Sequence, residues 1–425
     1  MSKTIEVPVS PGVLRWARES IGKTLKDVAK RLGVSEATVE KWESSERNPT
    51  LAYLRQLAPF YKRPLAAFLL PTAPKEPALP TDFRTLPEER KGQFSEKTRL
   101  VFSRARRIQS LIGEMGGVIE SQLPVLSRTV DEKDPEVSAR KIRQKLGVAV
   151  QAQFEWSDER LALMEWKRAI ETQGVYVLDF SFPMSDGRAF SLADDPPIIV
   201  LNHSDAPTAH IFSLFHEFSH LLRGEGGICD FSEQGRTHEW YCNRFAAEFL
   251  VPGESLLGHS LVSGHQRHEP WTDEILKHLA GNFKVSSEMM LRRLLTLGKT
   301  TERFYRTKKD EWEAKFAETG EKKRRGRRNL SRQCVRENGL PFVRLVLDSV
   351  HTDRITYRDA SDYLGLSAKY VPEVATIVSD TNTGATDPAT MSTLSRPSVM
   401  TAWARSRLTE GTSRSASMKG DTDGT

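Results

Sequence analysis

The chain has 425 residues, of which 38% are hydrophobic and 28% are charged, with a formal net charge of +6. This composition is ordinary for a soluble protein, and the length allows two or three domains. No apolar run approaches the roughly 20 residues of a membrane span, and MSKTIEVPVSPG lacks the apolar core of a signal peptide. Three cysteines without a spacing pattern argue against a disulfide scaffold, so we expect a cytoplasmic protein without membrane contact.

The first predicted module, residues 1–71, is all α-helical. Thr24 with Asp27 three residues later resembles a capping box, and Gly33 suits a left-handed helix end. Ser35 is an N-cap residue for the next helix. The resulting order of helix, short turn and helix in TLKDVAKRLGVSEATVEKW resembles an XRE-type (Cro/CI-like) helix-turn-helix domain.

By that resemblance, residues 35–41 form a recognition helix that enters the major groove of double-stranded DNA. The expected DNA-binding residues are Ser35, Glu36, Thr38 and Lys41. Two features depart from the family. Leu25 stands where a glutamine usually contacts the DNA backbone, and Glu36 and Glu40 repel phosphates, although a glutamate can accept a hydrogen bond from cytosine. The alternative is a helical module that keeps the fold and mediates protein contacts.

Residues 72–150 are predicted to be a Pro-rich linker and a helical connector, with helices at 95–123 and 135–146. A further helix is expected at 158–172. The strand-like runs VYVLDFSF, AFSL and PPIIVLNHS then predict a small sheet.

Residues 206–224 read as a strongly apolar helix that contains His216-Glu217-Phe218-Ser219-His220. Two histidines four residues apart lie on one face of a helix, where both can bind one tetrahedral zinc ion. Glu217 lies beside that position and can act as the general base in metal-assisted peptide hydrolysis. The alternative is two surface histidines, but the apolar helix favours half-buried imidazoles, which need partners.

A catalytic zinc site needs a third protein ligand and an open position. Residues 238–252 read as a second helix, and Glu239 at its start is the favoured ligand. Glu248 and, with less support, His238 remain alternatives. An acid in the first turn can also simply complement the helix dipole.

The segments FSLFHEFSHLL and E-x-x-x-N-x-F-A-A-E-x-L-x-P together resemble the ImmA/IrrE family of zinc metallopeptidases, and LAGNFKVSSEMMLRRLLTLG resembles its closing helix. The resemblance covers residues 174–298. It implies that His216, His220 and Glu239 bind Zn2+ and that Glu217 is the catalytic base of a gluzincin-like endopeptidase. The family cleaves repressor-like regulators, so a repressor-like or antitoxin-like protein is the implied substrate.

In a peptidase core of this kind, a strand edge aligns the substrate peptide by strand addition. Residues 199–202 are the candidate for that edge, although the sequence does not show which strand is exposed. His203 and His210 read as core or surface histidines. A second metal site at His259, His265 and His268 is a weaker alternative.

Residues 301–378 are expected to form a basic segment, with EKKRRGRR at 321–328, and a C-terminal helical domain. ITYRDASDYLGLSAKYV in that domain has a helix-turn-helix rhythm of its own. Residues 379–425 are rich in Ser, Thr, Gly and Asp with few aliphatic residues, and are predicted to be a disordered tail.

The predicted fold class is mostly α with a small β-sheet (α+β), in which the all-α module precedes a gluzincin-like metallopeptidase domain at 151–300. The predicted function is that of a cytoplasmic zinc endopeptidase acting in regulation, with double-stranded DNA or a protein partner bound by the helix-turn-helix module. The alternative is a DNA-binding transcriptional regulator or antitoxin whose zinc domain is a sensor or a structural unit.

Overall fold

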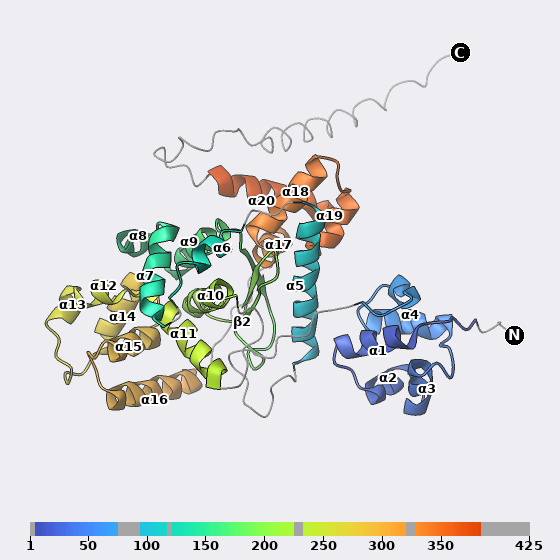
Figure 1. Cartoon of the computed structure of the whole chain (residues 1–425), viewed down its shortest axis with the longest axis horizontal. Coiled ribbons are helices and arrows are strands. Elements are labelled where there is room, and N and C mark those ends of the chain that lie inside the picture. The colour runs from blue at the N-terminus through green and yellow to red at the C-terminus, as the bar shows by residue number, and fades with distance from the viewer. Residues whose placement is uncertain are drawn as a thin grey trace, which may run out of the picture.

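The computed structural model describes residues 5–74, 94–116, 121–131, 133–224, 233–319 and 329–383. Helices surround one three-stranded sheet, which confirms the predicted α+β class (Figure 1). None of the described helices is long and apolar enough to cross a membrane. The predicted basic run at 321–328 and nearly all of the predicted tail lie outside the described residues.

The N-terminal helices form a unit of their own. They are α1 (Pro11–Ser20), α2 (Leu25–Leu32), α3 (Glu36–Glu43), α4 (Leu51–Phe60) and the 3-10 helix η1 (Leu65–Leu69). The expected capping box at Thr24 is present, and Gly33 ends α2 with φ 67°. The Ser35 side chain caps α3 by accepting from the Thr38 N–H. Val28, Val39 and Trp42 are buried in the core of this unit.

The sheet contains β1 (Tyr176–Phe180), β2 (Ala189–Leu192) and β3 (Ile198–Asn202) in the order β1-β3-β2. β1 is parallel to β3, and β2 is antiparallel to it. The expectation that residues 199–202 form the exposed edge is therefore wrong, because β3 is the central strand. Its continuous apolar run, IIVL, is typical of a strand that is covered on both faces. β2 is an edge strand instead.

Successive side chains of the strands enter two different cores, as the period of a β-strand requires. Val177, Ile199 and Leu201 belong to a core that includes α9 (Glu159–Glu171) and α10 (Pro207–Leu222). Leu178 and Val200 belong to the core on the other face. The sheet is thus the middle layer of three.

The second face of the sheet is covered by α5 and by C-terminal helices (Figure 1). These elements are α5 (Glu96–Glu114), α17 (Leu330–Asn338), α18 (Leu340–His351), α19 (Tyr357–Leu364), η3 (Ala368–Tyr370) and α20 (Val371–Thr383). The sequence predicts helices here but not this packing against the sheet. The expected helix at 95–123 ends early, because Gly116 adopts a left-handed conformation just after α5. Lys23 of the N-terminal unit pairs with Glu96 of α5 at 2.8 Å.

Further helices lie on the same side of the sheet as α10 (Figure 1). They are α6 (Leu123–Ser127), α7 (Pro135–Leu146), α8 (Val150–Glu155), α11 (Glu233–Leu250), α12 (Gly253–Leu257), α13 (Ser260–Ser263), α14 (Asp273–Phe283), α15 (Ser287–Thr296) and α16 (Glu302–Thr319). α11 begins at Glu233, ahead of the expected start at residue 238.

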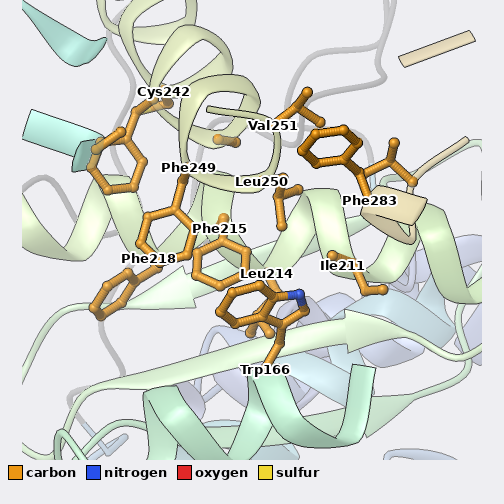
Figure 2. Packing of buried hydrophobic residues seen from close by; sticks show 14 of the residues in the cluster. Trp166, Ile211, Leu214, Phe215, Phe218, Cys242, Phe249, Leu250, Val251 and Phe283 are labelled. Carbon is orange, nitrogen blue, oxygen red and sulfur yellow. The ribbon is translucent and has the colours of Figure 1, made fainter. Parts of the chain in front are cut away.

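Aromatic side chains join α9, α10 and α11 (Figure 2). The Phe215 and Phe249 rings stack with their centroids 4.1 Å apart, and Trp166 meets Phe215 edge-on at 5.0 Å. All three side chains are fully buried, and burial of such a side chain contributes about 1.5–3 kcal/mol. This core fixes α10 against α11, the two helices that carry the candidate metal ligands.

Candidate metal centre

Three ionisable side chains from two helices converge at one point. His216 and His220 come from successive turns of α10, and Glu239 comes from the first half of α11. The two Nε2 atoms lie 3.2 Å apart. His216 Nε2 lies 3.4 Å from one oxygen of Glu239, and His220 Nε2 lies 3.3 Å from the other. Both histidines are buried, and Glu239 is partly exposed.

These separations fit a tetrahedral zinc ion. Two ligand atoms at roughly 2.0–2.1 Å from zinc and at a tetrahedral angle are about 3.3–3.4 Å apart. The distance between the two imidazole nitrogens, and the distance from each nitrogen to the Glu239 oxygen that faces it, match that spacing within 0.2 Å. Two imidazoles and one carboxylate also form the ligand set of a catalytic site, which keeps its fourth position open, whereas structural zinc sites use four protein ligands.

The electrostatics of the site keep Glu239 ionised. Burial by itself raises the pKa of this carboxyl group, but hydrogen bonds and positive charge from His216 and His220 outweigh the burial. The net result is a pKa well below the ordinary value of glutamate. A carboxylate must be deprotonated to bind a metal, so Glu239 is in the form that a ligand requires.

Glu217 lies on α10 between the two histidines and is 7% exposed. The Ser191 hydroxyl, on edge strand β2, donates a 2.9 Å hydrogen bond to Glu217 Oε2. Ser191 was missed in the sequence, where the only signal is one polar residue in the strand AFSL. The bond links the candidate general base to β2, an edge strand of the described sheet.

Glu248, the alternative third ligand, lies elsewhere on α11. Its carboxylate is paired with Arg293 and, at 3.0 Å, with Arg140. It also accepts from the Gly253 N–H at 3.2 Å. Neither Glu248 nor His238 belongs to the converging group. The structure therefore brings Glu239 to the two histidines, and places Glu248 in an ion-pair network.

Comparison with known families gives two matches. Residues 14–68 match the family described as helix-turn-helix, and residues 170–295 match the peptidase family M78, described as the IrrE N-terminal-like domain. The chain joins a helix-turn-helix domain to an ImmA/IrrE-like peptidase domain. The resemblance expected from the sequence is thereby confirmed, and the second domain is of the metallopeptidase type. Searches of curated proteins and of solved structures gave no match.

The other histidines of the ImmA/IrrE-like domain have different surroundings. His210 Nε2 lies 2.5 Å from the backbone oxygen of Asn202 and anchors α10 to the end of β3. The His265 ring stacks on Trp271 at 3.6 Å, and His259 accepts from the Leu261 N–H. Within the described residues, the alternative of a second metal site at His259, His265 and His268 has no support, because they form no group of converging ligand atoms.

Of the expected DNA-binding residues of the helix-turn-helix domain, Ser35 is the N-cap of α3, Glu36 and Thr38 lie in its first turn, and Lys41 lies in its last turn. Ser35, Glu36 and Lys41 are exposed, and Thr38 is half-buried. The hydroxyls of Ser35 and Thr38 lie 2.8 Å apart, and Ser35 also caps the helix, so both are engaged within α3. Glu36 and Lys41 remain the charged candidates for contact with DNA.

Proposed function

We propose that the chain is a zinc-dependent endopeptidase acting in regulation, with a repressor-like or antitoxin-like protein as its substrate. The observation that carries this proposal is the convergence of His216, His220 and Glu239 at tetrahedral spacing, with Glu217 beside them. The helix-turn-helix domain would bring the peptidase to DNA or to a DNA-bound partner.

In the proposed reaction, His216, His220 and Glu239 hold the metal. Zinc, when bound, supplies a Lewis acid that polarises a carbonyl and makes water a stronger nucleophile. The Glu217 carboxylate accepts a proton from the attacking water and then donates it to the leaving amine of the cleaved peptide. The Ser191 hydroxyl orients the Glu217 carboxylate for both transfers.

The position of β2 supports an extended peptide as the substrate. β2 pairs with β3 along one side and is an edge strand of the described sheet. A peptide that adds to this edge forms main-chain hydrogen bonds with it. Because Ser191 of β2 contacts Glu217, a peptide bound there would pass close to the catalytic base. This arrangement favours an endopeptidase, which cleaves internal peptide bonds of its substrate.

The proposal is tested by comparing new protein N-termini in the native host that carries either the intact chain or Glu217→Gln, with and without stress. We expect cut sites that vanish with Glu217→Gln, because the variant lacks the proton acceptor. A matched control is Glu254→Gln, which changes an exposed glutamate of α12.

Zinc content of the purified Glu217→Gln variant should equal that of the intact chain, since Glu217 is not among the three ligands. Identical N-termini in all strains would contradict the peptidase proposal.

The second candidate function is a DNA-binding regulator whose zinc domain senses a ligand or holds structure. The helix-turn-helix match and the exposed Lys41 favour it. The presence of Glu217 and its hydrogen bond to Ser191 favour hydrolysis, because a structural zinc site needs neither. Unchanged N-termini together with salt-dependent binding to a palindromic promoter fragment would support this candidate.

A further inference from the structure

Two distant segments of the chain share the same residues at the same spacing. Six residues of the helix-turn-helix domain recur 332 positions later, in a segment outside both family matches. The pairs are Thr24 and Thr356, Asp27 and Asp359, Leu32 and Leu364, Gly33 and Gly365, Ser35 and Ser367, and Val39 and Val371. These positions cover the start of one helix, the turn after it and the start of the next.

The repeated residues make the same local structure in both places. Thr356 and Asp359 form a reciprocal capping box at the start of α19, as Thr24 and Asp27 do for α2. Both helices thus begin with side chains that satisfy the same backbone donors.

The turn after the helix is also the same. Gly365 has φ 64° and ψ 36°, against 67° and 35° for Gly33. The next backbone N–H reaches back over the helix end in both cases, from Leu366 at 3.0 Å and from Val34 at 3.1 Å. This is the Schellman arrangement, and it fixes the direction in which the following helix leaves.

A third helix completes the likeness. α18 precedes α19 and packs against both α19 and α20, as the first helix of a three-helix unit does. Ala360, Leu364 and Val371 are buried between the helices. One difference is that the last helix opens with a 3-10 turn, η3, because Pro372 has no N–H for an α-helical bond to residue 368. α18, α19, η3 and α20 form a second helix-turn-helix unit.

The exposed start of the last helix is less acidic here than in the N-terminal domain. Glu36 and Glu40 of α3 correspond to Ala368 and Pro372, and all four residues are exposed. Lys369 is exposed as well, with its ammonium group 5.0 Å from the ring of Tyr370. Phosphates therefore meet less repulsion at this helix than at α3.

The last helix also carries one acid near its start, Glu373. Its carboxylate accepts hydrogen bonds from Ser331 at 2.7 Å and from Asn329 at 3.1 Å, which stabilise its ionised form. Tyr357 and Arg358 are exposed at the start of α19, where α2 has Leu25 and Lys26. A hydroxyl and a guanidinium group are donors for DNA phosphates, and that position of a helix-turn-helix faces the backbone.

We infer that this second unit binds double-stranded DNA through the start of η3 and the start of α19. The rest of α20 is unavailable, because Val374, Ala375 and Val378 are buried in the core shared with the sheet. This does not prevent binding, since the first residues of a recognition helix make the base contacts. The chain would then carry two DNA-contacting units, one at each end of the described structure.

The test uses the full chain and a labelled DNA duplex with a randomised core, with binding measured by fluorescence anisotropy over a range of salt. Lys30→Glu with Lys41→Glu reverses two exposed positive charges on α2 and α3 and is expected to disable DNA binding by the N-terminal domain, and we expect residual binding in that background. Adding Lys369→Glu should weaken the residual binding about tenfold and reduce the salt slope by about one. Lys277→Glu, on the exposed face of α14, is the matched control.

Lys369→Gln removes the charge without reversing it and should have a smaller effect in the same direction. Equal binding by the Lys369→Glu and Lys277→Glu variants would overturn the inference and make the second unit a packing module. Loss of all binding in the Lys30→Glu, Lys41→Glu background would also overturn it. The N-termini measured for Glu217→Gln do not depend on either result.

Discussion

Helix α11 carries two glutamates whose surroundings are opposite. Glu239 lies against two imidazoles and is partly exposed, while Glu248 is 1% exposed and lies against two guanidinium groups. From the sequence, Glu239 is the favoured third zinc ligand and Glu248 is an alternative. Their partners decide the question, because a carboxylate already neutralised by arginines gains little from a metal ion, whereas one that faces two imidazoles completes a ligand set.

The comparison shows two ways of keeping a carboxylate inside a protein. An ionised group is costly to bury unless it is paired and hydrogen-bonded. Glu248 is compensated within the chain, by Arg293, Arg140 and the N–H of Gly253. Glu239 is compensated by histidines that must be neutral when they bind a metal, so its compensation then comes from the ion.

The largest effect is expected from Arg293→Met, which leaves Glu248 buried with one partner fewer. Arg293 also pairs with Glu136 at 3.1 Å, so two carboxylates each lose one of their partners. We expect the free energy of unfolding to fall by about 3–5 kcal/mol, as measured by urea denaturation followed by tryptophan fluorescence. Zinc content should not change. Arg292→Met, at the exposed neighbouring position, should cost about 0.5 kcal/mol or less.

A loss below about 1 kcal/mol for Arg293→Met would mean that Glu248 does not depend on this arginine, and would remove the contrast between the two glutamates.

The second effect is on metal affinity. Glu239→Gln removes a charged ligand, so zinc affinity, measured with a competing chelator, should fall at least about 100-fold, or about 2.7 kcal/mol. Glu248→Gln is the matched change on the same helix and should leave zinc affinity within about twofold, since its carboxylate lies in the arginine network. An equal loss of affinity in both variants would contradict the assignment of Glu239.

The sequence predicted both helices of the candidate site, because His216 and His220 stand four residues apart in an apolar helix and a second helix follows. It did not decide between Glu239 and Glu248. The two glutamates differ because α7 and α15, from distant parts of the chain, place Arg140 and Arg293 against Glu248. Spacing along one helix shows which residues share a face, but not what that face meets.

The local sequence pattern also did not predict the order of the strands in the sheet or the order of the layers. The strand runs predict the sheet, but they do not predict that residues 199–202, the candidate for its edge, lie in the central strand, because strand pairing depends on contacts between distant segments. The continuous apolar run of β3 was the available signal for a central strand. The covering of the sheet by α17, α18 and α20 has no local signature, since any amphipathic helix can bury its apolar face against several partners.

A third carboxylate, that of Glu217, extends the comparison of Glu239 and Glu248. The change that tests it is expected to have the smallest effect of those proposed. Glu217 accepts a hydrogen bond from a neutral group, the Ser191 hydroxyl, whereas Glu248 is paired with arginines. A neutral donor orients a carboxylate while leaving it able to accept a proton, which suits a general base. Ser191 is on this argument a positioning residue.

Ser191→Ala should lower kcat about tenfold, which corresponds to about 1.4 kcal/mol, because the Glu217 carboxylate loses the hydrogen bond that orients it. KM for a peptide cleaved by the intact chain should stay the same, and so should zinc content, since neither substrate binding nor the ligands are changed. Ser191→Thr keeps the hydroxyl and should restore most of the rate. An equal loss of rate in the alanine and threonine variants would instead indicate that the packing of β2 against α10 matters and not the hydrogen bond.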